Sequence, residues 1–171
     1  MIDIRILDGD DAHRLIDALA AILHDAVTKG ASVGFMNPFS MTEAVTFYTE
    51  IAARVQRDEI ILFAAFNHER VVGTCQLIPS KKPNQIYRAD LVKLLVHSNH
   101  RNKGIGASLL VAADNEVKRQ GFKLVTLDTG LNTAEAVYER AGYQRAGIIP
   151  KYALFPDGTY CDTVFFYKWY D

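Results

Sequence analysis

The sequence has few of the features that mark specialised protein classes. It has only two cysteines, Cys75 and Cys161, which stand far apart and match no metal-binding spacing. Each lies in an apolar, strand-like segment, so we expect two reduced core thiols in a cytoplasmic protein. The five histidines also show no metal-ligand spacing, and no metal cofactor is expected.

Long apolar runs and an excess of charge of one sign are also lacking. No stretch approaches the roughly 18 uninterrupted apolar residues of a membrane helix, so no membrane partner is expected. The first residues, MIDIRILDGDD, predict neither a signal peptide nor a transit peptide. The formal net charge of -1, from 19 basic and 20 acidic side chains, argues against a nucleic-acid partner. Any bound anion must therefore be held by a local arrangement of donors.

The sequence does contain enough apolar material for one folded domain. Hydrophobic residues make up 49% of the 171 residues, and residues 1–171 are expected to form a single domain. Apolar patterning predicts about seven strands, over residues 2–7, 60–66, 71–78, 86–97, 123–128, 143–149 and 160–169. It predicts about four helices. The first has its N-cap within Asp8 to Asp11 and buries Leu15 to Ala26, the second follows a Ser40–Glu43 capping box, and the others span residues 104–119 and 133–141. A meander followed by alternating helices and strands predicts an α/β (α+β) sandwich with a mixed, mostly antiparallel sheet.

The segment from Leu94 to Ala107, LLVHSNHRNKGIGA, carries the most chemistry. A buried strand ends there, and a helix starts at two glycines after a polar loop. Unpaired N–H groups at a helix start favour a phosphate, and Gly104 and Gly106 let a diphosphate approach the backbone. Arg101 and Lys103 add positive charge. A junction that uses glycine for geometry alone stays open as an alternative, and the dinucleotide-binding Gly-x-Gly-x-x-Gly spacing is absent.

Two blocks of the sequence resemble the GNAT family of N-acetyltransferases. Residues 101–106, RNKGIG, resemble the acyl-CoA signature of Arg or Gln, two residues, Gly, one residue, and Gly or Ala. Residues 132–143, NTAEAVYERAGY, resemble the Asn-x-x-Ala-x-x-x-Tyr-x-x-x-Gly-aromatic segment. The resemblance implies the GNAT fold and acetyl-CoA as co-substrate. The residues that it implies in cofactor binding are Leu94, Leu95, Val96, Arg101, Asn102, Lys103, Gly104, Ile105, Gly106, Ala107, Asn132 and Tyr138.

One position departs from the family's signature, and one region resembles a subgroup of the family. Many relatives carry glycine where this chain has Asn102, but asparagine tolerates left-handed backbone angles, so we expect the loop to form. Residues 148–158 and 162–167 are similar to small-molecule acetyltransferases of the tabtoxin-resistance type. That similarity implies a small-molecule amine as acceptor.

Acetyl transfer to an amine needs a proton acceptor, because an amine with a pKa of about 10 is mostly charged near neutral pH. Asp90 lies on the strand leading to the glycine turn, and Asp128 ends the neighbouring parallel strand, where such sheets open a crevice. Strand alternation predicts that Asp90 shares a face with Leu94. A solvated strand position for Asp90 and a turn-forming role for Asp128 stay open, and so does the choice of base.

The departing thiolate, with a conjugate-acid pKa of about 8.5, needs a proton donor, and a tyrosine is suited to this. The resemblance implies Tyr138 in that role and the backbone N–H of Val96 as the donor to the oxyanion. A plain core role for Tyr138 is the alternative. Asn132 heads the same helix, where capping and a cofactor contact can coexist.

Fewer residues of the sequence indicate where the acceptor amine binds. Phe35, Tyr152, Asp90 and Asp128 are predicted to bind the substrate, and an aromatic final strand leaves one face suited to a second subunit in a homodimer. The leading hypothesis is an acetyl-CoA-dependent N-acetyltransferase in which a small-molecule primary amine attacks directly in a ternary complex. The alternatives are acetylation of a protein N-terminus or lysine, and a non-catalytic acetyl-CoA-binding regulatory module.

Overall fold

A computed structural model describes residues 2–132 and 134–171 of the chain. Seven strands are present: β1 (Ile2–Leu7), β2 (Ile61–Asn67), β3 (Arg70–Pro79), β4 (Arg88–Val96), β5 (Leu124–Gly130), β6 (Gln144–Leu154) and β7 (Tyr160–Trp169). Five α-helices are found in the described residues: α1 (Gly9–Arg14), α2 (Ile16–Thr28), α3 (Met41–Gln56), α4 (Ile105–Gln120) and α5 (Glu135–Arg140). The predicted mixed α/β architecture is confirmed, with strand boundaries within a few residues of those expected.

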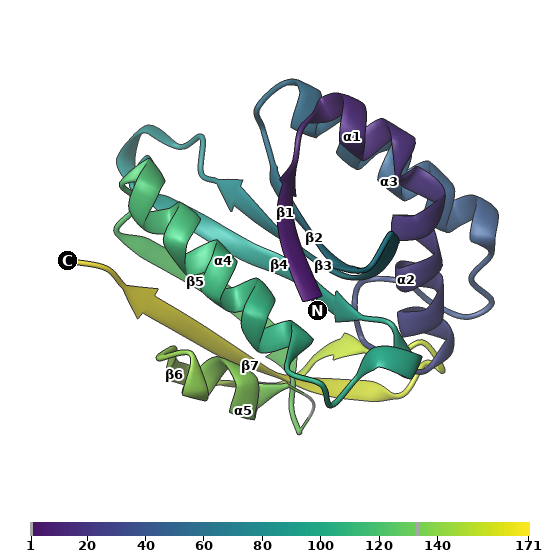
Figure 1. Cartoon of the computed structure of the whole chain (residues 1–171). Helices are drawn as coiled ribbons and strands as arrows, with labels where there is room; N and C mark the ends of the chain where they lie inside the picture. The colour runs from purple at the N-terminus through teal and green to yellow at the C-terminus, as the bar shows by residue number, and fades with distance from the viewer. Residues whose placement is uncertain (1, 133) are drawn as a thin grey trace.

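The strands form one sheet in the order β1-β2-β3-β4-β5-β7-β6 (Figure 1). All neighbours are antiparallel except β4 and β5, which run parallel. Their pairing covers only three residues of each strand, from Arg88 opposite Leu124 to Asp90 opposite Thr126. Beyond Asp90 the two strands separate, so the centre of the sheet opens toward the carboxyl ends of β4 and β5.

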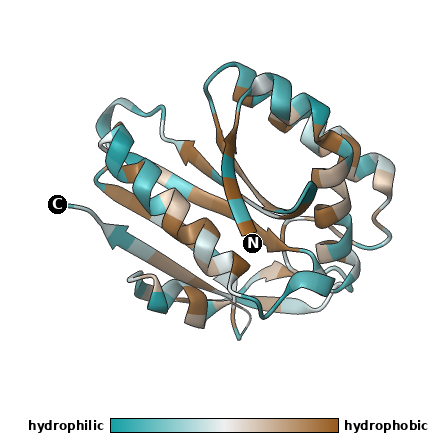
Figure 2. Ribbon diagram, viewed as in Figure 1, coloured by the Kyte–Doolittle hydropathy of each residue, from teal (hydrophilic) through white to brown (hydrophobic). Residues whose placement is uncertain are grey.

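Helices cover the two faces of the sheet unequally. α4 and α5 pack on one face, and α1, α2 and α3 pack on the other face over the β1–β4 half (Figure 1). Strand β2 shows why both faces are covered: Leu62, Ala64 and Phe66 belong to one apolar cluster, and Phe63 and Ala65 to the other. This explains its continuous apolar sequence. Apolar residues follow the strands and the inner sides of the helices (Figure 2).

The helices differ from the sequence-based expectation in two places. The predicted first helix is divided at Leu15, which ends α1 and starts α2, so the described residues form one α-helix more than expected. The predicted last helix included Thr133, which lies outside the described residues. The capping box of Ser40 and Glu43 is present, with Ser40 N–H donating to Glu43 Oε2 at 2.8 Å. None of the helices in the described residues has the length and hydrophobicity needed to cross a lipid bilayer.

A β-bulge in β4 corrects the predicted direction of its side chains. Thr74 pairs with Leu95 and Gln76 pairs with Val92, so one residue of β3 stands opposite two of β4. Lys93, at the bulge, has a φ of 52°. Leu91 therefore packs on the α4 side and Leu95 on the α2 side, although four positions separate them. Asp90 and Leu94 accordingly lie on opposite faces, because the extra residue reverses the alternation.

Candidate functional site

The β4–α4 connection has the geometry of an anion site. After β4 the chain makes one 3-10 turn (Ser98–His100) and enters α4 through Gly104, whose φ is 76°. Asn102 has a φ of 60°, so the expectation that asparagine adopts a left-handed conformation here is confirmed. No side chain of the described residues caps the α4 start, which leaves its first N–H groups for a ligand.

The space in front of the α4 start is open. A Cβ built on either Gly104 or Gly106 would meet no other atom within 4 Å. Arg101 and Lys103 are exposed beside it; Arg101 donates to the carbonyl of Val96 at 3.1 Å and lies 4.0 Å from the Asp25 carboxylate, and Lys103 donates to the carbonyl of Asn99 at 3.3 Å. This open, cationic helix start is suited to a phosphate group.

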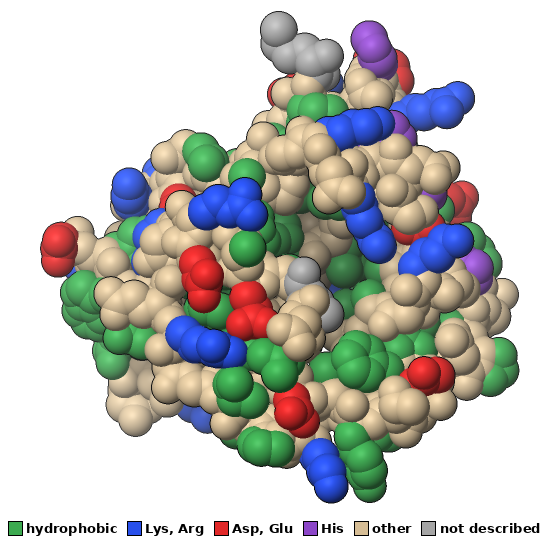
Figure 3. Space-filling model, turned by 90° about the horizontal axis from the view of Figure 1, so that it is seen from below, with side chains coloured by type: hydrophobic (Ala, Val, Ile, Leu, Met, Phe, Trp, Pro, Cys, Tyr) green, Lys and Arg blue, Asp and Glu red, His purple; other side chains and the backbone are tan. Residues whose placement is uncertain are grey.

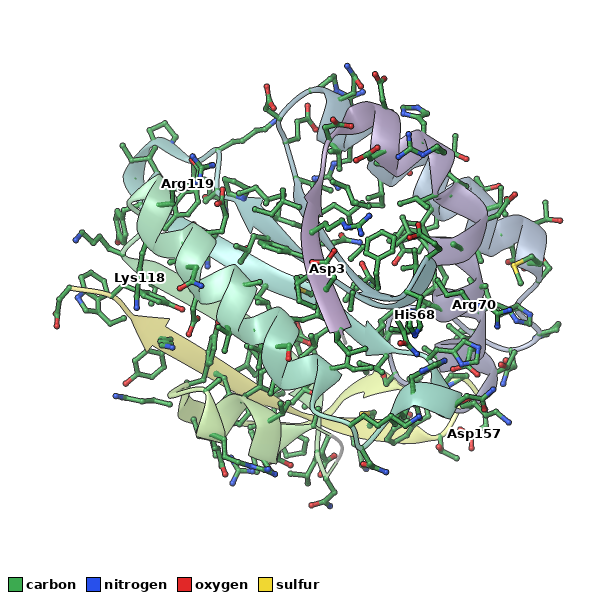
Figure 4. All side chains as sticks on the ribbon, in the orientation of Figure 1. Asp3, His68, Arg70, Lys118, Arg119 and Asp157 are labelled. Carbon is green, nitrogen blue, oxygen red and sulfur yellow. The ribbon has the colours of Figure 1, made fainter. Side chains whose placement is uncertain are left out.

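Other cations of α4 lie where the helix dipole favours them. Lys118 and Arg119 are at the far, C-terminal end of α4 (Figure 4), where the dipole is negative. The basic side chains near α4 therefore form two groups. Lys118 and Arg119 lie at its C-terminal end, and Arg101 and Lys103 lie in the loop before its start. Only the second group is placed to meet an anion at the glycine turn.

Asp25 holds the loop from a distant helix, and no sequence pattern indicated this role. Its carboxylate, on α2, accepts hydrogen bonds at 2.7 Å from both the N–H and the hydroxyl of Ser98. Burial opposes ionisation, but these hydrogen bonds and the charges of His97 and Arg101 lower the pKa of Asp25 below its usual value. An ionised Asp25 therefore holds the loop between β4 and α4 against α2.

Gly104 offers a test with an internal control. Gly104 and Gly121 both have a φ of 76°, flank α4 and have open surroundings. Replacing either by alanine is expected to cost a similar amount of stability, about 1–2 kcal/mol, because both place a Cβ in the left-handed region. Gly104→Ala should also weaken acetyl-CoA binding about tenfold, since its Cβ enters the phosphate space. Thermal unfolding and calorimetric titration of both variants measure the two effects, and equal losses of affinity would contradict the site.

The end of β4 presents backbone groups to the gap between β4 and β5. The N–H of His97 donates to the carbonyl of Val72 on β3 at 3.0 Å. In an antiparallel pair the neighbouring residue then points its N–H and C=O the other way. For Val96 that direction is toward β5, from which β4 has already separated. The carbonyl of Val96 accepts from Arg101 in this direction, and its N–H faces the gap.

Two cavities meet at Asp128, next to this gap. The larger, of about 530 Å³, is lined by Arg88, Asp90 and Asp128 among other residues of β4, β5 and β7. The smaller, of about 270 Å³, is lined by Lys93, Asp128 and the α2–α3 loop. From below, the molecule is hollowed near its middle, with hydrophobic side chains inside and charged side chains around the hollow (Figure 3). The incomplete helical cover over β5–β7 leaves this space open.

The two acids of the site have different surroundings. Asp90 is held by two partners: Arg88 lies 3.3 Å from it, and the hydroxyl of Thr126 donates to it. For Asp128, desolvation raises the pKa above the usual value, opposed by the charge of Lys93 and assisted by that of Asp90. Asp128 therefore holds a proton more readily than an aspartate free in water does.

Tyr138, on α5, is buried in the apolar cluster on the α4 side of the sheet, with 6% of its surface exposed. Its ring packs against Phe166 and Tyr143, at centroid distances of 5.9 and 6.0 Å. Burial raises the pKa of Tyr138 well above its usual value, and the charges of Cys75 and Asp128 raise it further. The hydroxyl is therefore protonated at neutral pH and able to donate.

The remaining predicted residues occupy varied positions. Asn132 is exposed, and its N–H donates to Glu135 at 2.6 Å; Ala134, not Asn132, occupies the N-cap of α5, which corrects the capping role. Phe35 packs on Phe39 and Phe47, and the exposed Tyr152 packs on Phe165. The described lining of the two cavities includes neither Phe35 nor Tyr152.

Two further sequence-based expectations can be compared with the structure. Both cysteines are buried and free, as predicted. In β7 the aromatic residues alternate as expected, with Phe166 buried and Tyr167 and Trp169 exposed. In the described part of the chain, His, Cys, Asp and Glu side chains form no group of three or more suited to a metal ion.

The fold is that of the acyltransferase class that the sequence resemblance implied, with a glycine-opened helix start after the strand beside a gap in a mixed sheet. The family model of the acetyltransferase (GNAT) domain matches residues 57–145, more than half of the chain. The chain therefore belongs to the GNAT acetyltransferase family, as the RNKGIG and NTAEAVYERAGY blocks predicted.

Individual relatives agree with this assignment. The chain is 33% identical to the human protein named N-acetyltransferase 8 over 88 residues. The aligned segment covers 50% of this chain but only 39% of that protein, so the chain matches less than half of this relative's length. An N-acetyltransferase from Staphylococcus aureus superposes with a TM-score of 0.82 at 19% identity, over 99% of this chain and 98% of that one. A putative acetyltransferase from Salmonella typhimurium, solved with acetyl-CoA, gives 0.78 at 19% identity, over 99% and 94%. At these identities the solved structures support the fold alone.

Proposed function

We propose that the protein transfers the acetyl group of acetyl-CoA to the primary amine of a small molecule. The observation that supports this most directly is the open edge between β4 and β5, which the N–H of Val96 faces and beside which Asp128 lines both cavities. Tyr138 is added to them from the sequence resemblance, and its protonated hydroxyl is suited to donate. We take these three groups as the oxyanion donor, the base and the acid of the reaction.

Acetyl-CoA would be held by the chain segments on the α4 side of the gap. The α4 start, with Gly104 and Gly106, receives the diphosphate, and Arg101 and Lys103 add charge-assisted contacts. The end of β4, from Leu94 to Val96, receives the extended arm along its free edge. When bound, acetyl-CoA supplies an activated acetyl group at the gap.

The acceptor enters from the opposite side, through the two cavities. Asp128 accepts a proton from the ammonium group, directly or through water, and the neutral amine attacks in a ternary complex. The N–H of Val96 donates to the oxygen that gains negative charge, and Tyr138 gives its proton to the departing sulfur as the carbon–sulfur bond breaks. The second proton, which the acetylated nitrogen releases as it becomes a neutral amide, passes through water to restore Tyr138, and Asp128 returns its proton to solvent. We assign the base role to Asp128 because Asp90 is already bound by Arg88 and Thr126. The charge of Asp90 then serves to raise the pKa of Asp128.

The two acids are distinguished by their amide variants. Asp128→Asn is expected to lower kcat about 100-fold, the usual contribution of a general base, and Asp90→Asn about tenfold. In the wild type, kcat should fall as pH decreases through the pKa of Asp128, which lies above 3.8, because protonation removes the base. That acidic limb should be absent in Asp128→Asn. A pH profile of kcat for the three proteins is the measurement, and an unchanged limb in Asp128→Asn would remove Asp128 from this role.

The activity itself is tested by thiol release from acetyl-CoA with a panel of amines, amino acids and peptides. Release with small amines, and not with peptides, supports the proposal. Release with peptides alone would instead identify a protein N-terminus or lysine as acceptor. Tight acetyl-CoA binding without release from any amine would indicate a regulatory module. Among these outcomes, the compact and partly buried cavities favour a small acceptor over a peptide, which needs an open groove.

A further inference from the structure

Lys93 is a partly buried lysine at the centre of the acceptor side, and the activity proposed above does not use it. We propose that Lys93 selects acceptors that carry an anionic group next to the amine, as a carboxylate stands next to the amine of an amino acid. The inference rests on the proposed acetyl transfer and names the substrate class of the same site.

The bulge in β4 places this side chain. Lys93 has a φ of 52°, and it stands where two residues of β4 face one of β3. Its ammonium donates to the carbonyl of Val33, in the α2–α3 loop, at 2.9 Å. The same nitrogen lies 5.8 Å from the ring centres of both Phe35 and Phe47. These contacts hold the ammonium at the wall of the smaller cavity rather than in bulk water.

The charge of Lys93 is incompletely neutralised. Burial lowers the pKa of Lys93, and the charge of Asp128 partly restores it. None of the ion pairs within 4.0 Å among the described residues involves its ammonium, and the hydrogen bond to Val33 uses one of three donors. An ammonium removed from water in this way is stabilised by a nearby anion. The cavity therefore offers a cation that an anionic ligand group would complete.

Asp128 lines the same cavity, so the space of about 270 Å³ carries both signs of charge. A bound amino-acid-like acceptor can direct its ammonium to Asp128 and its anionic group to Lys93. That arrangement orients the amine toward the base that deprotonates it. Gly34 lines the same cavity, and a Cβ at that position would lie 3.9 Å from the Lys93 ammonium.

A simpler role for Lys93 is to tie the α2–α3 loop to β4 through Val33. The two roles differ in what they do to substrate choice. A tether changes the efficiency with all acceptors by the same factor. A subsite for an anion changes it only for acceptors that carry one.

The experiment compares an α-amino acid with its carboxamide, and a plain alkylamine, as acceptors for the wild type and Lys93→Met. The wild type is expected to prefer the amino acid over its carboxamide about 10- to 100-fold in kcat/KM, the range of a charge-assisted hydrogen bond. Lys93→Met should lose that preference and stay within about threefold of wild type with the carboxamide and the alkylamine. Lys93→Gln, which keeps a donor for Val33, gives the same comparison if the methionine variant unfolds.

Lys151→Met is the matched control. Lys151 also has a left-handed φ, of 54°, and also lies over an aromatic ring, that of Tyr160, but it is exposed on β6. The variant Lys151→Met should leave the preference for the amino acid over its carboxamide unchanged. The inference would be overturned if Lys93→Met lost the same factor in kcat/KM with all acceptors, or if the wild type did not prefer the amino acid to its carboxamide. Either result would leave the proposed acetyl transfer standing. The failure of acetyl transfer itself has a different signature, the absence of thiol release with any amine, and it would remove both.

Discussion

Tyr138→Phe is expected to lower kcat about 100-fold and to leave the KM for acetyl-CoA nearly unchanged. The phenol is protonated well beyond neutral pH, since burial raises its pKa, and it is the only part of the side chain that the substitution removes. Loss of a general acid usually costs between 10² and 10⁴ in rate. The ring stays to fill its place against Phe166, so packing changes little. Steady-state thiol release at saturating acceptor measures the effect.

Tyr143→Phe provides the comparison for this result. Tyr143 is equally buried, its ring is 6.0 Å from that of Tyr138, and burial raises its pKa in the same way. It lies farther along the chain, just before β6, and near the hydrogen-bonded pair of Tyr170 and Asp114. Its variant should change the unfolding temperature more than kcat. A Tyr138→Phe enzyme with full turnover would exclude Tyr138 as the acid and leave it as a core residue.

Most of the fold follows from local signals in the sequence. The continuous apolar run of β2 predicts a strand covered on both faces, and its residues alternate between the two clusters. Glycines mark the start and end of α4, and both have the left-handed φ that favours glycine. The helix break at Leu15 was not predictable in this way, because the apolar spacing continues through it and only packing on α3 and β1 divides the helix.

The site was predictable where the chemistry lies in a local motif, and not where it depends on register. The glycine turn around Gly104 is such a motif. Lys93 is not, since strand alternation gives no indication of the bulge that turns it toward the cavities. The same bulge places Asp90 and Leu94 on opposite faces. Asp25 was missed for a related reason: its partner Ser98 is 73 residues away, and no pattern within α2 distinguishes a loop anchor from a solvated acid.

Gly106→Asp is expected to raise the KM for acetyl-CoA about 100-fold or more while keeping or increasing the stability of the free protein. Gly106 is the second residue of α4, where a carboxylate favours the helix dipole by about 0.3–1 kcal/mol and replaces a weak helix former. The same carboxylate occupies the open space in front of the helix start, where a diphosphate would lie. Two like charges 4 Å apart near a protein surface repel by about 4 kcal/mol, and partial screening by salt still leaves a large loss.

The opposite signs of the two effects make this variant informative. A substitution that damaged the fold would lower affinity and stability together, whereas this one should separate them. Gly106→Ala is the control, because the acyl-CoA signature admits alanine here and a methyl group adds helix propensity without charge. It should be more stable than the wild type and bind acetyl-CoA within a few-fold of it. Calorimetric titration and thermal unfolding of the three proteins give both quantities. Unchanged acetyl-CoA affinity in Gly106→Asp would mean that the phosphates bind elsewhere, and the assignment of the α4 start as their site would be wrong.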